Sequence, residues 1–152
     1  MDIGQICSRD VVTVSVSSTL FEAAETMLRR HVGALVVTAG HRQVVGVVTD
    51  RDVVQAQLQR TADLSRLSVG EVMTKEPHVL RERDTIAGGL AHLQRWGVRR
   101  APVVDGKGSL VGFVSTDDLL AELSQQLLNL SDLVGQQRRL ESSGTLRTRH
   151  AS

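Results

Sequence analysis

Aromatic residues and cysteines are scarce in this 152-residue chain, which has two phenylalanines, one tryptophan, no tyrosine and one cysteine. So few aromatic rings argue against a surface that stacks nucleic-acid bases. The single cysteine, Cys7, excludes an internal disulfide framework and is typical of a protein from a reducing compartment. The five histidines share no metal-ligand spacing, so we expect no metal site.

Charge of one sign and long apolar runs are missing as well. The 18 basic and 17 acidic residues leave a formal net charge of +1, which argues against a general affinity for nucleic acids or membranes. No apolar run approaches the ~18 residues that cross a bilayer, and the start of the chain lacks the pattern of a signal peptide. No Ser-His-Asp arrangement, P-loop or dinucleotide-binding glycine pattern occurs. We therefore expect a cytoplasmic protein without catalytic residues.

What the chain does contain is a repeat with an offset of 66 residues. A glycine, two apolar residues, a hydroxyl residue and, three places further on, an aspartate occur at residues 46–52 and again at residues 112–118. The offset holds without a gap from Ile3, matched by Val69, to Val54, matched by Leu120. Self-similarity at a fixed spacing indicates a duplicated structural unit. Polar side chains repeated between a strand and a helix suggest paired ligand sites.

Both copies predict the same order of elements. In the first copy, short β-branched runs predict strands at 11–14, 34–38 and 43–49. An apolar stripe predicts a helix from Leu20. Thr19 and Glu22 have the spacing of a capping box at the start of this helix. A second helix is expected from Asp50 to about Gln59. The second copy repeats this order at residues 77–80, 84–96, 100–104, 109–115 and from about 117.

Each predicted unit is therefore β-α-β-β-α. A unit of about 55 residues buries too little surface to be stable alone, so we expect the two to pack together in an α/β (α+β) fold. The predicted boundaries are a first repeat at 1–60, a linker at 61–68, a second repeat at 69–123, a helical extension at 124–135 and a polar, disordered tail at 136–152.

An apolar stripe runs from the end of the second repeat into the helical extension. Leu120, Leu123, Leu127, Leu130 and Val134 follow one another at alternating spacings of three and four residues. This seam is shorter than the three or four heptads that would argue for a coiled coil. We expect it to pack over the repeats or against a second subunit.

The duplication, the glycine-to-aspartate signature and the run Val-Arg-Arg-Ala-Pro-Val-Val-Asp at residues 98–105 resemble a pair of cystathionine-β-synthase (CBS) domains. The resemblance covers about residues 3–123. It implies a pseudo-twofold pair with two clefts that bind adenosine-containing ligands such as AMP, ATP or S-adenosylmethionine. It also implies a homodimer. Members of the family with no demonstrated ligand are known, so the resemblance is stronger for the fold than for a bound ligand.

The resemblance implies that each cleft joins the signature of one repeat to the strand entry and pre-strand valine of the other. The first and stronger site is then expected to contain Cys7, Val12, Thr13, Val32, Phe113, Ser115 and Asp118. The second, weaker site is expected to contain Val47, Thr49, Asp52, Met73, His78, Val79 and Val98.

Two arginines distinguish the clefts in this interpretation. Members of the family that hold phosphates place basic residues at the positions of Arg51 and Arg99, which the resemblance assigns to the first cleft. Guanidinium groups suit phosphate because they donate planar, charge-assisted hydrogen bonds. Gly33 and Asp117 hold the corresponding positions for the second cleft. The first cleft is therefore the one expected to bind a nucleotide.

Simpler explanations remain for the same residues. Thr49 with Asp52, and Ser115 with Asp118, have the spacing of helix caps. The two arginines could be solvated at the surface or form salt bridges with Asp50 and Asp117. The function predicted from the sequence is a non-enzymatic regulatory module with an adenine nucleotide as regulatory ligand, no required cofactor and an unknown effector protein. The alternatives are a ligand-free interaction or dimerisation module that acts through its helices, and a nucleic-acid binder that uses the basic tail.

Overall fold

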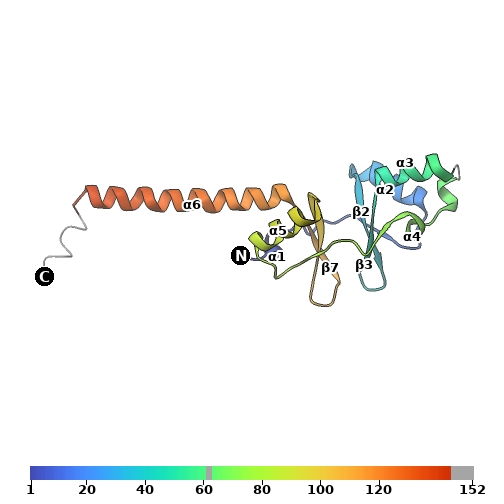
Figure 1. The fold of residues 1–152 in the computed structure, drawn as a ribbon, viewed down its shortest axis with the longest axis horizontal. Helices are drawn as coiled ribbons and strands as arrows, with labels where there is room; N and C mark the ends of the chain where they lie inside the picture. The colour runs from blue at the N-terminus through green and yellow to red at the C-terminus, as the bar shows by residue number, and fades with distance from the viewer. Residues whose placement is uncertain (61–62, 145–152) are drawn as a thin grey trace. The chain divides into compact units, whose positions relative to one another are not determined.

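The computed structural model describes residues 1–60 and 63–144. They divide into two compact units, Met1–Thr116 and Asp117–Ser152, each described by itself below. The first unit contains two sheets with their helices, and a long helix forms the second (Figure 1). The sequence predicts tandem β-α-β-β-α repeats in which the last helix continues into a C-terminal extension, and this fold is confirmed, with α6 as that continuous helix.

The first repeat is built around a four-stranded sheet in the order β1-β2-β3-β4, in which β1 runs parallel to β2 and the other pairs are antiparallel. Thr19 and Glu22 form the predicted capping box at the start of α2, because each side chain accepts from the other's backbone N–H, at 3.1 Å and 3.0 Å. The elements are β1 (Thr13–Ser15), α2 (Leu20–Arg30), β2 (Ala34–Ala39), β3 (Gln43–Thr49), α3 (Asp50–Arg60) and β4 (Thr74–Lys75).

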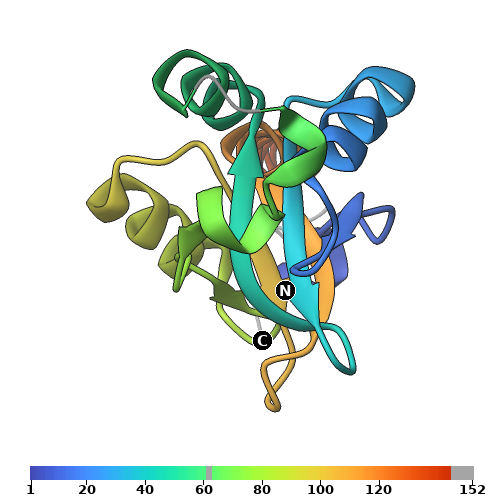
Figure 2. The ribbon, with the colours of Figure 1, turned by 90° about the vertical axis from the view of Figure 1, so that its right-hand side faces the viewer.

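The second repeat copies this arrangement with a three-stranded sheet in the order β5-β6-β7, again with a parallel first pair. Its elements are β5 (Leu80–Arg81), α5 (Ile86–Trp96), β6 (Arg100–Val104) and β7 (Leu110–Ser115). The two hairpins, β2–β3 and β6–β7, end in loops on the same side of the unit (Figure 2). Gln43 joins them near those loops by donating from Nε2 to Ser109 Oγ at 3.1 Å.

The two repeats exchange their first segments. Helix α1 (Ile3–Ile6) lies against the second repeat, beside α5 and β7, whereas α4 (Val69–Val72) follows the short helix η1 (Leu64–Arg66) and lies against the first repeat, beside β3 (Figure 1). The hydrogen bonds match across the offset of the repeat. Ile3 N donates to Asp84 O at 2.9 Å, and Val69 N donates to Ser18 O at 2.8 Å.

The side chains of the exchanged segments complete the core of the opposite repeat. Ile3 and Val69 are both fully buried. Strand β4 extends the exchange, because Thr74 pairs with Val47 of the first repeat just as Ser8 pairs with Phe113 of the second. Each repeat is therefore incomplete without the opening residues of the other.

The signature glycines lie where this exchange brings two backbones together. A Cβ atom on Gly112 would collide with Cys7 Sγ, and one on Gly46 would collide with Met73 Sδ. The nearest backbone atoms, Ser8 O and Thr74 O, would both lie only 2.9 Å away. These glycines are thus required for packing between the repeats.

The second unit is the helix α6 (Thr116–Ser142), whose first residue still belongs to the first unit. It continues past Gly135 to Ser142, so residues 136–142 are helical where the sequence predicted a disordered tail. The reason is the composition of this stretch, whose glutamine, arginine, leucine and glutamate residues all favour helix. Residues 143–144 form a turn, and the rest of the predicted tail, 145–152, lies outside the described residues. Among the helices described, none is long and apolar enough to span a membrane.

Candidate nucleotide site

Two neighbouring pockets lie in the first unit, with cavity volumes of about 260 and 270 Å³. We call them the Asp10 pocket and the Arg99 pocket. The Asp10 pocket is lined by Ser8, Asp10, Val11, Val12, His31, Val32, Gly33, Ala34, Val36, Arg100 and Phe113. The Arg99 pocket is lined by Ala34, Val47, Thr49, Thr74, Pro77, His78, Val98, Arg99, Arg100, Pro102 and Phe113.

The two pockets are related by the duplication of the chain. Strand-entry residue Val12 of the Asp10 pocket corresponds to His78 of the Arg99 pocket, and pre-strand residue Val32 corresponds to Val98. Three lining residues, Ala34, Arg100 and Phe113, are common to both pockets. The pockets therefore adjoin each other.

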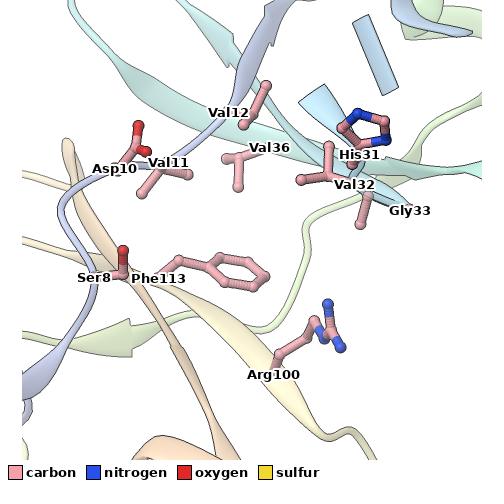
Figure 3. Close-up of a pocket in the computed structure, with 11 residues that line it drawn as sticks. Ser8, Asp10, Val11, Val12, His31, Val32, Gly33, Val36, Arg100 and Phe113 are labelled. Carbon is pink, nitrogen blue, oxygen red and sulfur yellow. The ribbon is translucent and has the colours of Figure 1, made fainter. Parts of the chain in front are cut away.

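Figure 3 shows how the Asp10 pocket is walled. The ring of Phe113 extends from β7 toward the valines that β2 and the preceding segments contribute. The side chain of Arg100 rises from β6 toward Gly33. Asp10, on the opposite wall, accepts from Arg30 Nη2 at 3.3 Å.

The Arg99 pocket is lined mainly by apolar side chains. Val47, Val98, Pro77 and other apolar residues line it. His78 stacks on Trp96 with ring centroids 4.5 Å apart and planes within 7° of parallel, which fixes the orientation of its imidazole ring.

The two pockets differ in the charged residues that line them. The Arg99 pocket is lined by two arginines, Arg99 and Arg100, and by no acidic residue. The Asp10 pocket is lined by Arg100 alone among the arginines and also by the carboxylate of Asp10. An anionic ligand group is therefore favoured more strongly in the Arg99 pocket, because two guanidinium groups attract it and no carboxylate repels it.

The hydroxyl and aspartate of the first signature form a helix cap. Asp52 Oδ2 accepts from Thr49 N at 2.8 Å, and Thr49 Oγ1 accepts from Asp52 N at 3.2 Å. This reciprocal pair satisfies two backbone donors where α3 begins. The capping explanation therefore holds for Thr49 and Asp52. Thr49 also lines the Arg99 pocket, whereas Asp52 lies at a separate polar hollow beside Arg60 and Glu71.

The structure brings part of each predicted set together. Val12, Val32 and Phe113 of the first set line the Asp10 pocket. Val47, Thr49, His78 and Val98 of the second set line the Arg99 pocket. Cys7, Thr13, Arg51 and Ser115 of the first set line neither pocket, and neither do Asp52, Met73 and Val79 of the second. Asp118 lies in the first turn of α6, in the second unit.

Arg99 differs most from its predicted place. The sequence prediction grouped it with the first cleft, but it lines the same pocket as Val98, which was assigned to the second. The reason is local, because Arg99 directly follows Val98 where the chain enters β6. Gly33 occupies the corresponding position after Val32 in the Asp10 pocket.

The sequence prediction also missed Asp10, His31 and Arg100. Asp10 and His31 lie in connections, where no periodic pattern marks them. Arg100 stands in the run at residues 98–105 and could have been found there, since it corresponds to the pocket-lining Ala34. Within the described parts of the chain, no three histidine, cysteine, aspartate or glutamate residues are placed to hold a metal ion.

The family model of the CBS domain matches two stretches of the chain, residues 3–59 and residues 69–125. The chain belongs to the CBS-domain family. An uncharacterised 17.7 kDa protein of Acidianus ambivalens is 33% identical to this CBS pair over 121 residues, which cover 80% of the chain and 72% of that relative. An uncharacterised protein of Methanopyrus kandleri is 26% identical over 120 residues. The CBS pair spans 61% of the length of this second relative.

Solved structures agree with this assignment. CBSX2 of Arabidopsis thaliana, a CBS-pair protein, has been solved in complex with AMP. This complex superposes with a TM-score of 0.69 at 26% sequence identity, over 82% of the present chain and 96% of the CBSX2 chain. The similarity thus extends over nearly all of CBSX2. AMP binding is therefore seen in a solved CBS pair that is similar to this chain.

Proposed function

We propose that this CBS pair is a regulatory module that binds an adenine nucleotide of the AMP, ADP or ATP type. The observation that carries the proposal is the Arg99 pocket, where two guanidinium groups adjoin walls formed by Val47, Val98 and Pro77. Apolar walls suit a purine ring, and paired arginines suit a phosphate. The AMP complex of CBSX2 supports the same ligand class.

We assign the phosphate of the nucleotide to Arg99 and Arg100. This differs from the sequence argument, which favoured the first cleft because Arg51 and Arg99 were expected there. Arg51 lines neither pocket, and the Asp10 pocket is lined by one arginine only, Arg100, together with Asp10, whose carboxylate pairs with Arg30. The Arg99 pocket is therefore the better nucleotide site of the two.

The decisive experiment is calorimetric titration of AMP into the wild-type protein and the variants Arg99→Gln and Arg51→Gln. A hydrogen bond to a charged group contributes about 1.5–3 kcal/mol, so Arg99→Gln should weaken AMP binding about tenfold or more. Arg51→Gln is the matched control, because it removes the same charge outside both pockets, and it should leave AMP affinity nearly unchanged. Greater damage from Arg51→Gln would reverse the assignment.

Adenosine provides a second comparison. It lacks the phosphate, so its affinity should change little in Arg99→Gln. A wild-type protein that binds neither AMP nor adenosine would contradict the nucleotide proposal as a whole. At a free ligand concentration of about 100 times the dissociation constant, binding should stabilise the folded state by roughly 2.7 kcal/mol. A thermal-shift assay detects a change of this size readily.

The remaining parts of the proposal follow from this function. The module itself performs no catalysis and needs no cofactor, and it acts as a cytoplasmic homodimer on an effector protein. The Asp10 pocket serves as a weaker, second adenosyl site. The alternative is a ligand-free interaction module, which the exposed leucines of α6 favour. That alternative predicts no thermal shift with any adenine compound.

A further inference from the structure

Helix α6 presents a largely exposed seam of apolar side chains along one face. The α6 seam consists of Leu120, Leu123, Leu127, Leu130 and Val134, at alternating spacings of three and four residues. Leu127 and Leu130, at its centre, are 67% and 56% exposed. Apolar side chains contiguous along one face of a helix typically mark an interaction surface.

If the α6 seam is extended by one position to Gln137, the spacing of its residues is the same when read from either end. Leu127 and Leu130 lie equally far on either side of the midpoint between residues 128 and 129, and so do Leu123 and Val134. Leu120 and Gln137 form a third such pair. Two copies of this helix, packed antiparallel about that midpoint, therefore bring Leu127 opposite Leu130 of the partner and Leu123 opposite Val134 of the partner. The spacing of the seam is that of side chains that interlock between paired helices.

Charge decides the direction of pairing. Asp117 lies in the first turn of α6, and Arg138 lies near its end, on the same edge of the seam. In an antiparallel pair, Asp117 of each copy lies beside Arg138 of the other, so opposite charges meet at both ends. In a parallel pair, this edge of one copy and the same edge of the other lie on opposite sides of the seam, so Asp117 does not meet Arg138 and the attraction is lost.

We infer that α6 is a self-association surface, on which a second copy of this chain docks its own α6 antiparallel, with Leu127 opposite Leu130. The paired region from Leu120 to Gln137 is roughly 27 Å long at 1.5 Å per residue. Leu133 and Leu140, which are 54% and 50% exposed, lie along one flank and widen the apolar contact. This inference concerns the assembly of the chain and does not depend on the nucleotide proposal.

Disulfide cross-linking of the full chain tests both the pairing and its direction. Chains with Leu123→Cys and chains with Val134→Cys are mixed and oxidised, and covalent dimers are measured by non-reducing electrophoresis. Antiparallel pairing puts the two new thiols opposite each other, so the mixture should form the mixed dimer and each variant alone should form little. Cys7 remains in place in both variants, because it is 8% exposed.

Leu128→Cys provides the matched control. Leu128 is 60% exposed, but it lies about 100° around the helix from Leu127, off the seam. Mixed with Val134→Cys, it should form at least about tenfold less covalent dimer than Leu123→Cys does. Adding Leu127→Gln and Leu130→Gln to the cross-linking pair should remove most of the mixed dimer, whereas adding Leu128→Gln should not.

The charges give an independent check. Arg138→Asp should lower the yield of mixed dimer, and combining it with Asp117→Arg should restore the yield, because the attraction is rebuilt with its sign reversed. Efficient cross-linking of Leu123→Cys with itself would show parallel helices and overturn the inference. Absence of covalent dimer in the mixture would overturn it as well, even if the protein is dimeric through its other surfaces.

Discussion

A methyl group added at Gly112 would enter the contact through which the first segment of the chain completes the second repeat. The Cβ atom of Gly112→Ala would collide with Cys7 Sγ and would lie 2.9 Å from Ser8 O and 3.1 Å from Cys7 Cβ. Two of these neighbours cannot rotate away, because one is backbone and the other is a Cβ. The segment must therefore shift, at the cost of about 1–3 kcal/mol that overpacking of a core usually has.

Urea unfolding of wild-type protein and Gly112→Ala measures this cost. In a chain of this size, 1 kcal/mol corresponds to a fall in Tm of about 2–4 °C, so thermal unfolding should follow. Gly106→Ala is the matched control, because no heavy atom lies within 4 Å of its new Cβ. Its stability should stay within about 0.5 kcal/mol of the wild-type value.

A double-mutant cycle with Cys7→Ala locates the cause. Removing Sγ relieves the closest collision, so Gly112→Ala with Cys7→Ala should cost at least about 0.5 kcal/mol less than the sum of the single variants. Wild-type stability in Gly112→Ala would refute the packing argument. Loss of AMP binding without loss of stability would instead support the idea that the glycine admits a ligand.

Two further predictions concern the connections. Gly97 ends α5 at a φ of +67° with no atom near a new Cβ, so Gly97→Ala should destabilise by about 1–2 kcal/mol through backbone strain alone, as urea unfolding would show. Backbone N–H donation from Ser109 and Lys107 holds the pKa of Asp105 below its usual value. The ionised Asp105 carboxylate therefore stabilises the folded state above about pH 4, where a free carboxyl is ionised, and this stabilisation is lost as the pH falls through the lowered pKa. The difference in urea midpoint between wild-type protein and Asp105→Ala should shrink on acidification.

Local patterns predicted most of the elements. The hairpin strand Gln43–Thr49 and the strand Arg100–Val104 have the bounds that their β-branched and apolar runs indicated. The exchange of α1 and α4 between the repeats could not be predicted from local patterns. Ser8 pairs with Phe113 across more than a hundred residues, and a contact at that separation leaves no periodic trace in either segment.

The site was predictable to the extent that the internal repeat determines it. Val12 and His78, and Val32 and Val98, line matching pockets because they occupy equivalent positions. The charge of each pocket was not predictable in the same way. It depends on which wall Arg99 and Arg100 face, and spacing along the chain does not give the direction of a side chain.

The exchange between the repeats also determines the order in which the protein can complete its fold during synthesis. The first sheet lacks β4 until Lys75 has been made. Helix α1 is made before its partners in β7, which end only at Ser115. The α1 segment therefore has to wait until both repeats have been made, and such non-local contacts slow the final step of folding. A ribosome that stalls between the two repeats would hold an unfinished core rather than a finished half.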